Sequence, residues 1–449
     1  MVTKRFYQSF DLLRARISQR LDYFWAGLLF AATLIVLLST SQVRISGEEE
    51  VYFRAASLYS QWFRELGDHL IAGDLFRSFS QESIDRYFSY RSDQPVVMKM
   101  LFALSHMLFH ETLGWMQAST AYRLPTMVIA AGLVSSLFLF GAELGRKYFQ
   151  SSRFAYLFGV TAAGALLLQP QFFRESHLAT LNIPLVALWF AVIYAYWRSF
   201  SSQNWAVATG ALFGLALSVE FRALYLPLLL GLHWFLLSFW EFRLRREGTS
   251  GLVLTYPQIK SALWAMLVGG PLLFYTLWPR LWFETFERTQ GYFQFHLHQD
   301  LSASSTLQSF LLFLHTVPPT LLFAGAVGLL LLFFDSQIVP RTKEATHALR
   351  KKQWPSPPKT TDHRGLPLLL VLSLLFPLFL STAGDINASL LTMPFLALIG
   401  GWAVVSLVAQ LQRRLRVWDR ENLTPLFTLL FPLLLLLPAL IETVQSHPM

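Results

Sequence analysis

Two neighbouring stretches, LDYFWAGLLFAATLIVLL (Leu21–Leu38) and EEEVYFRAASLYSQWFREL (Glu48–Leu66), decide the fold class of this 449-residue chain. The first stretch is apolar over the length that a helix needs to cross a bilayer. In the second, apolar residues recur at helical spacing along one stripe, which predicts an amphipathic helix lying against the membrane. Three carboxylates open that helix. Because ionisable groups are costly at a membrane, they indicate a functional site.

The composition of the whole chain also indicates a membrane protein. Hydrophobic residues make up 54% of the chain and charged residues 14%. Many further apolar runs approach the length of a span, so we predict an all-α polytopic membrane protein with about eleven transmembrane helices and juxtamembrane helices in the first outer loop. The chain has no cysteine, which excludes disulfides, thiolate ligands and a cysteine nucleophile. Its net charge of +9 is concentrated in short loops, so it reports topology and not nucleic-acid binding.

Lys and Arg cluster in loops that we place in the cytoplasm. Two apolar segments, Pro95–His110 and Leu124–Leu144, separate the acidic first outer loop from the first basic loop. Because an outer loop and a cytoplasmic loop must be separated by an odd number of crossings, only one of the two segments can cross the membrane. The first is shorter and carries Lys99, so we predict a juxtamembrane or re-entrant helix there. The N-terminus is then cytoplasmic and the C-terminus outside, in a multi-pass protein of the plasma (inner) membrane. The basic loops cover residues 145–153, 197–205, 241–260, 339–364 and 412–420.

The predicted organisation has four parts. A Pro- and Lys-rich stretch indicates a flexible linker between two transmembrane bundles. No internal repeat is visible, which weakens a transporter built on repeated halves. The parts are a basic cytoplasmic N-terminus (1–21), a transmembrane module with large outer loops 43–94 and 279–309 (22–338), a cytoplasmic linker (339–365) and a C-terminal transmembrane bundle (366–449).

The register of the amphipathic helix separates its three opening acids. At about 100° per residue, Glu48 lies near the centre of the apolar stripe and Glu49 lies on its flank. Glu50 points away, toward Arg54 four residues on. We therefore expect Glu48 to be the buried acid. A helix cap is the alternative, because Ser46 and Glu49 have capping-box spacing.

The other outer loops supply further polar candidates. Lys99 lies one turn into its apolar segment, where a cation can meet a lipid phosphate or snorkel to the interface. The second outer loop contributes His177 and Asn182. His296 and His298 stand two residues apart, which places them on different faces of a helix and makes a weak metal pair.

Several motifs occur in an order that resembles a known family, the multipass GT-C glycosyltransferases of family 39. That family includes protein O-mannosyltransferases and, more distantly, the aminoarabinose transferases. The resemblance covers about three quarters of the chain. The motifs are EEEVY (Glu48–Tyr52), QPVVMK (Gln94–Lys99), YRLP (Tyr122–Pro125), HLATLNIP (His177–Pro184), WPRLW (Trp278–Trp282) and HLH (His296–His298).

The resemblance implies a role for individual residues. Glu48 and Glu49 stand where the family has an Asp-Glu pair, so Glu48 would be the general base. Lys99 matches the family lysine and would hold the donor phosphate, and Arg123 would be structural. Two departures stand out. Gln94 replaces the family histidine, and an asparagine replaces the aspartate of the second outer loop, which leaves a changed substrate or a degenerate enzyme open.

The implied activity is sugar transfer from a polyprenyl-phosphate-linked donor to a lipid, glycan or protein acceptor at the outer face, by an inverting GT-C mechanism. The lipid phosphate leaves as an anion and needs cations, for which Lys99, Arg222 and Arg280 are the candidates. No cofactor is required, and a divalent cation is possible through the acids and His296. Membrane lipids are the other expected partners. The candidates for substrate binding are His177, Asn182, His296 and His298.

Two other classes of protein compete with this interpretation. A lipid or sugar transporter, or a flippase, would explain the number of spans and the charges near the membrane, but it would move its substrate without consuming a donor. An intramembrane metal-dependent hydrolase would need paired histidines on one helix face, and the sequence has no HExxH-like pair.

Overall fold

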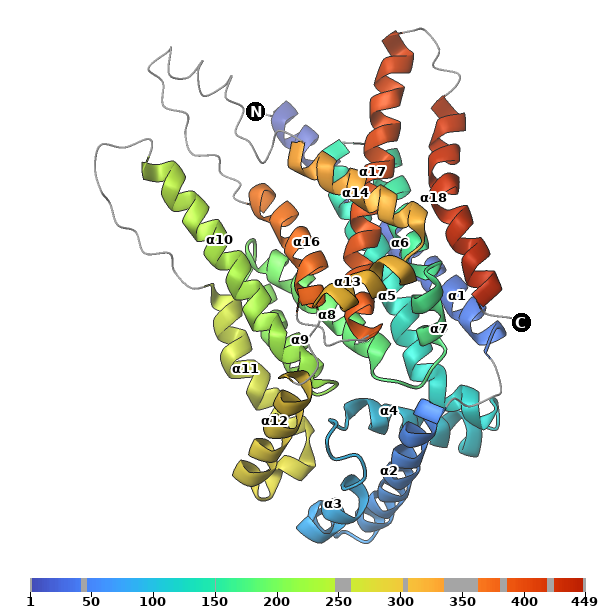
Figure 1. Cartoon of the computed structure of the whole chain (residues 1–449), viewed down its shortest axis with the longest axis vertical. Helices are drawn as coiled ribbons and strands as arrows, with labels where there is room; N and C mark the ends of the chain where they lie inside the picture. Colours follow the sequence, from blue (N-terminus) through green and yellow to red (C-terminus); the bar gives the residue numbers. More distant parts are fainter. Residues whose placement is uncertain are drawn as a thin grey trace.

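The computed structural model describes residues 2–41, 47–149, 151–246, 260–301, 306–334, 362–379, 386–417 and 424–446. Within these ranges every regular element is a helix, which confirms the predicted all-α fold. Most helices run along one elongated bundle (Figure 1). The bundle contains α1 (Val2–Ser39), α5 (Ala118–Phe149), α6 (Ser152–Leu167), α7 (Pro170–Ser176), α8 (Asn182–Ser199), α9 (Gln203–Leu217), α10 (Leu226–Arg246), α11 (Ser261–Leu277), α13 (Thr306–Thr316), α14 (Pro319–Phe334), α16 (Asp362–Phe379), α17 (Ile386–Val417) and α18 (Thr424–Ser446).

A second group of helices lies at one end of the bundle, the lower end in Figure 1. Phe79 and Trp282, which are far apart in sequence, stack there with ring centroids 6.0 Å apart. The described parts of the predicted outer loops 43–94 and 279–309 therefore meet at one end of the molecule. This group contains α2 (Gly47–Ile71), η1 (Leu75–Phe79), α3 (Gln81–Phe88), α4 (Val97–His106), the π-helix η2 (Met107–Thr112), η4 (Pro279–Trp282) and α12 (Thr285–Leu301).

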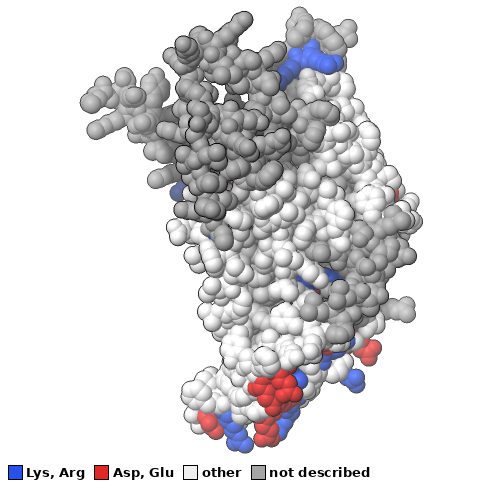
Figure 2. Space-filling model, turned by 60° about the vertical axis from the view of Figure 1, so that its left-hand side comes forward, with Lys and Arg blue, Asp and Glu red and all other residues white. Residues whose placement is uncertain are grey.

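Charged side chains gather at this same lower end on the face that Figure 2 shows. Above them a broad band of the surface carries almost no charged side chain. Such a band is what a bilayer requires, because an unpaired charge in the hydrocarbon region is costly. The surface therefore agrees with a multi-pass membrane protein.

The number of spans depends on how short helices are counted. Five of the described helices are long and apolar enough to cross a membrane, and two bent pairs, α6 with α7 and α13 with α14, raise the number to seven. Four more helices, α8, α9, α11 and α16, are shorter or less apolar and run in the same bundle. The described residues therefore support five to seven spans, and the predicted number of about eleven stays a prediction.

The segment Pro95–His110 does not form a spanning helix. It contains α4, which has only 10 residues and runs into the π-helix η2. A helix of that length is too short to cross a bilayer. The crossing that follows is made by α5, which has 32 residues. The lack of a spanning helix in this segment agrees with the predicted juxtamembrane or re-entrant helix, whereas the orientation of the chain stays a prediction.

Close helix contacts fix α5 within the bundle. A Cβ added to Gly141 would lie 2.9 Å from the Cα of Gly159, and one added to Gly145 would lie 2.6 Å from the Cα of Ala155. These small residues let the backbones of α5 and α6 approach each other, as in other membrane helix pairs. The second half of α5 is therefore held closely against α6.

The centre of the bundle is α17, whose apolar window is 94% buried. It packs against α6 and α8 as well as α14 and α16. Most of the predicted linker 339–365 lies outside the described residues. The division into two bundles stays a prediction.

Candidate functional site

A buried ion pair joins the start of α2 to the start of α5. Glu49 has no exposed surface and Arg123 is 2% exposed. Arg123 donates from Nε and Nη2 to the two carboxylate oxygens of Glu49, both at 2.7 Å. The backbone N–H of Ala179 donates to Glu49 Oε1 at 3.0 Å. A bidentate pair with a further donor is strong and geometrically specific, so it fixes three segments of the chain together.

The prediction that Glu48 is the buried acid of the cluster needs correction. Glu49, which was expected on the flank, is fully buried, whereas Glu50 is exposed as expected. The reason is that the buried arc of α2 is wider than its apolar stripe and includes Ala56 and Ser60, which lie on the same side as Glu49. The side chain of Glu48 lies outside the described residues, so its role as base stays a prediction.

The residues predicted in the second outer loop contact other parts of the chain. His177 is buried, with Nδ1 2.7 Å from the carbonyl of Phe173 and Nε2 2.8 Å from the hydroxyl of Thr40. Asn182 donates from Nδ2 to Glu175 Oε2 at 2.9 Å. The loop that carries Ala179 between them therefore lies against the Glu49 pair. The substrate-binding role of these two residues stays a prediction.

Lys99 is fully buried on α4 and does not snorkel. Its Nζ donates to the backbone carbonyls of Arg91 and Gln94, at 2.9 Å and 2.8 Å. It also lies 5.8 Å from the centroid of the Tyr59 ring. In the part of the chain that the structure describes, no carboxylate forms an ion pair with this ammonium. Burial lowers the pKa of Lys99 to about 7.

A second cation lies close to Lys99. Arg280 of η4 is one of the groups that shift the pKa of Lys99. Burial lowers that pKa most, the negative charge of Asp93 raises it, and the positive charge of Arg280 lowers it. The pKa of Arg280 is itself lowered, first by burial and then by Arg288. Arg288 has a carboxylate partner, since its Nη1 lies 2.7 Å from Asp85. Arg280 Nη1 is buried without a hydrogen-bond partner among the described residues. The site therefore has more positive charge than its own side chains neutralise.

Other buried polar atoms around these cations also lack partners among the described residues. The indole of Trp278 packs edge-on against Tyr292, with ring centroids 5.0 Å apart. A buried polar atom that loses its hydrogen bond costs about 1 to 3 kcal/mol, so several together indicate a polar ligand. The atoms are Tyr59 Oη, Gln94 Oε1, Trp278 Nε1 and Tyr292 Oη.

Arg222 lies in the short helix η3 (Phe221–Tyr225), between α9 and α10. Its Nη1 is 3.5 Å from Glu220 Oε1. Glu220 also faces α2, since its charge adds to burial in raising the pKa of Tyr52 to about 12. The third predicted phosphate cation is therefore partly matched by a carboxylate, unlike Lys99.

His296 of α12 is held by two contacts. Its Nε2 lies 2.7 Å from the carbonyl of Asp93, and its ring stacks on Phe221 at 4.7 Å. Among the side chains that the structure describes, no three His, Asp or Glu residues are grouped as a metal site requires. The side chains of Glu48 and His298 lie outside that set, so a divalent ion stays a prediction.

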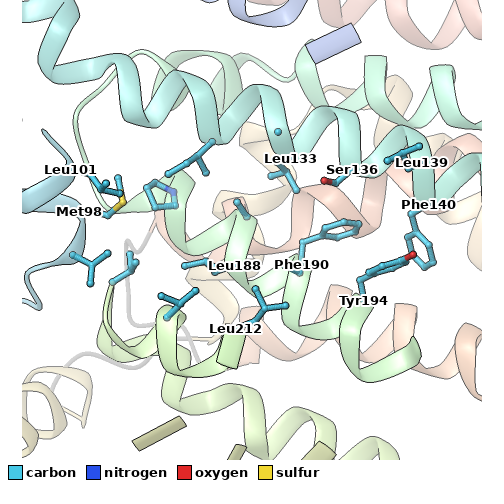
Figure 3. A pocket seen from close by; sticks show the side chains of 18 of the residues that line it. Met98, Leu101, Leu133, Ser136, Leu139, Phe140, Leu188, Phe190, Tyr194 and Leu212 are labelled. Carbon is cyan, nitrogen blue, oxygen red and sulfur yellow. The ribbon is translucent and has the colours of Figure 1, made fainter. Parts of the chain in front are cut away.

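An apolar groove of about 520 Å³ begins at α4, the helix that carries Lys99. At one end it is lined by Met98 and Leu101 of α4, and it continues between α5, α8 and α9 (Figure 3). Its far end lies beside Phe140 and Tyr194. The groove therefore places an apolar channel along the bundle, and one of its ends is formed by the helix that carries Lys99.

Solved structures with the same architecture are known. No family model and no curated protein match the chain. ArnT from Cupriavidus metallidurans is similar in two states, bound to undecaprenyl phosphate and apo. Both have a TM-score of 0.55 and 15% identity, over 94% and 95% of this chain and 76% of ArnT. The chain has the GT-C fold. Membership of family 39 stays a prediction from the motifs.

The GT-C fold brings together residues that the sequence suggests one at a time. Lys99, Arg280 and His296 come from distant segments and meet at one end of the bundle. Tyr59 and Glu220 also line this region and were not among the predicted site residues. Tyr59 was counted only as part of an apolar stripe. Glu220 lies two residues before the candidate cation Arg222, and this position was a usable signal.

Proposed function

We propose that this protein is a GT-C glycosyltransferase that moves a sugar from a polyprenyl-phosphate-linked donor to an acceptor at the outer face of the inner membrane. The observation that carries the proposal is the buried Lys99, which has no carboxylate partner among the described residues, on the helix α4 whose Met98 and Leu101 line one end of an apolar groove, together with the partly buried Arg280 close to it. A ligand that suits both features has an anionic head and a long apolar tail. The acceptor is a lipid, a glycan or a protein.

The cations would hold the phosphate. A desolvated ammonium and guanidinium attract an anion far more strongly than the same groups do in water. The phosphate would also supply hydrogen-bond acceptors for Arg280 Nη1 and for the Trp278 indole, which have none among the described residues. Each new bond to a charged group contributes about 1.5 to 3 kcal/mol.

The groove would hold the first isoprene units of the carrier. Nearly all of its lining is apolar, with residues such as Leu133, Leu188 and Leu212 along its length (Figure 3). Burying apolar surface there contributes about 0.8 kcal/mol for each methylene. The bound undecaprenyl phosphate of ArnT, which shares the fold, supports a carrier of this class.

The reaction is a displacement at the anomeric carbon with inversion. The acceptor oxygen attacks that carbon, its bond to the phosphate oxygen breaks, and polyprenyl phosphate leaves as an anion stabilised by Lys99 and Arg280. The proton of the acceptor passes to a carboxylate, and Glu48 at the start of α2 is the proposed base. Glu49 positions α2 through Arg123. No cofactor is required for these steps.

The test compares cells that carry the protein, cells that lack it and cells with Glu48→Gln. Mass spectrometry of lipid-linked sugars and of surface glycans is the measurement. We expect one sugar to disappear from its acceptor and the lipid-linked donor to accumulate, both without the protein and with Glu48→Gln. Unchanged glycans in cells without the protein would overturn the proposal. Loss that Glu48→Gln does not reproduce would indicate a flippase.

A further inference from the structure

The pair Glu220 and Arg222 occupies a fixed turn beside the two cations. Phe221 between them stacks on His296, so the turn is attached to α12. Glu220 has extended backbone (φ −155°, ψ 146°), and its carboxylate lies 3.5 Å from Arg222 Nη1. The two side chains remain 17% and 24% exposed. The pair is thus held in place, with Glu220 Oε2 and Arg222 Nη1 buried and the rest of both side chains partly exposed to a ligand.

Two tyrosines connect this pair to the proposed phosphate site. Tyr52 of α2 and Tyr292 of α12 both have raised pKa values, first because of burial and then because Glu220 is close. The side chains of Tyr52 and Gln94 are hydrogen-bonded. The carbonyl of Gln94 accepts from Lys99 Nζ at 2.8 Å. Glu220 therefore lies a short chain of contacts from the cation that would hold the phosphate.

The chemistry of the pair does not suit the phosphate itself. A carboxylate repels a phosphate, and it reduces the net charge that Arg222 offers. A carboxylate only accepts hydrogen bonds and a guanidinium only donates them, so together they complement a group that does both. Hydroxyl groups have that property. The Tyr292 ring packs against Phe221, which lies between the two residues of the pair, and its apolar surface is of the kind that suits the C–H face of a sugar ring.

We infer that Glu220 and Arg222 bind hydroxyl groups of the donor sugar next to the phosphate held by Lys99. This inference rests on the proposed function and names its sugar subsite. Because the pair is electrically neutral overall, the subsite favours a neutral sugar over an amino sugar. Arg222 is thereby assigned to the sugar, whereas the sequence assigned it to the phosphate.

The test measures binding of three probes to the purified full-length protein. The probes are undecaprenyl phosphate, undecaprenyl phosphate carrying a neutral hexose, and undecaprenyl phosphate carrying an amino pentose. For Glu220→Ala we expect unchanged affinity for the sugar-free lipid and a loss of about tenfold or more for the hexose-bearing lipid, because one hydrogen bond to a charged group is lost. Glu220→Gln, which keeps an acceptor oxygen, should lose less.

Two controls keep the result interpretable. Glu82→Ala removes a carboxylate from an exposed Glu–Arg pair on α3 and should leave all three affinities unchanged. The double variant Glu220→Arg with Arg222→Glu keeps an ion pair but exchanges its ends, so it should still bind the hexose-bearing lipid poorly. Recovery of that binding would show that the pair is only structural and overturn the inference.

Other outcomes separate this inference from the function on which it rests. An equal loss for the sugar-free lipid would place Glu220 in phosphate binding or in folding and overturn the sugar subsite. A loss in Glu220→Gln confined to the amino pentose would mean that the carboxylate binds an ammonium group, which also overturns it. If the wild-type protein binds none of the three lipids, the proposed function fails as well.

Discussion

Two buried charged sites lie along α2 and differ in how well their charges are matched. Near the start of the helix, Glu49 and Arg123 form a bidentate pair. Ten residues further along, which is about 15 Å of helix, Tyr59 faces Lys99 and Arg280. There the described residues provide backbone carbonyls but no ion-pair partner for Lys99. The first site is complete within the chain and holds helices together, whereas the second has spare positive charge and suits an anionic ligand.

The largest expected effect is a loss of stability when the charge pair of the first site, Glu49 and Arg123, is broken. Glu49→Ala would leave the Arg123 guanidinium buried without its carboxylate, which costs about 3 to 5 kcal/mol. We expect a large fall in thermal stability of the purified protein, measured in detergent. The double variant Glu49→Leu with Arg123→Met removes both charges and should recover most of the stability. If Glu49→Ala melts like the wild type, the pair does not hold α2 to α5.

The second prediction concerns the affinity for the lipid tail in the apolar groove that begins at α4. A Cβ on Gly132 would meet nothing within 4 Å, so Gly132→Leu should fold and extend into the groove. Losing the contacts of two methylenes lowers affinity roughly tenfold, at about 0.8 kcal/mol each. We expect weaker binding of both undecaprenyl phosphate and farnesyl phosphate, because the first isoprene units of either lipid would lie in the groove.

Gly231→Leu provides the matched control for the groove. Gly231 lies on α10, also has open space around it, and does not line the groove. This variant should bind both lipids as the wild type does. Unchanged binding of both lipids in Gly132→Leu, or equal losses in the two glycine variants, would mean that the carrier tail does not occupy the groove.

The smallest effect is a pH dependence. Because burial lowers the pKa of Lys99 to about 7, the ammonium that binds phosphate is lost as the pH rises through that value. Affinity for undecaprenyl phosphate should fall about fivefold between pH 7 and pH 8. Stability without lipid should change in the opposite direction, since the unfolded lysine keeps its proton up to its ordinary, higher pKa.

Lys99→Arg serves as the reference for this titration, because a guanidinium stays charged throughout. The phosphate ionises in the same way with both proteins. The ratio of their lipid affinities therefore reports only the protonation of Lys99. A ratio that does not change between pH 6 and pH 8.5 would mean that Lys99 does not titrate in contact with the lipid.

The sequence predicts the fold well because its signals are local. Apolar length and the placement of Lys and Arg predict membrane helices and a non-spanning α4 without knowledge of any long-range contact. The resemblance to GT-C enzymes also selects Lys99 and the region of Arg280. These features depend on residue type and order, which are visible in one chain.

The parts that the sequence misses depend on contacts between distant segments. Periodicity places Glu48 at the centre of an apolar stripe, but the partner that buries Glu49 is Arg123 on another helix. Likewise, nothing local shows that Glu220 faces Tyr52 and Tyr292. The apolar periodicity of a helix predicts which side of the helix is buried, but it does not predict which residues of other segments contact that side.

Equilibrium binding of undecaprenyl phosphate to the wild-type protein and to Lys99→Met tests most directly whether the unmatched cations bind an anionic lipid. We expect roughly a tenfold to hundredfold loss of affinity, which corresponds to about 1.5 to 3 kcal/mol. Thermal stability without lipid should stay the same or rise, because a buried charge is removed. Arg86→Met, which removes an exposed cation from α3 at the same end, should bind normally. Unchanged affinity in Lys99→Met would contradict a lipid-phosphate site at this position.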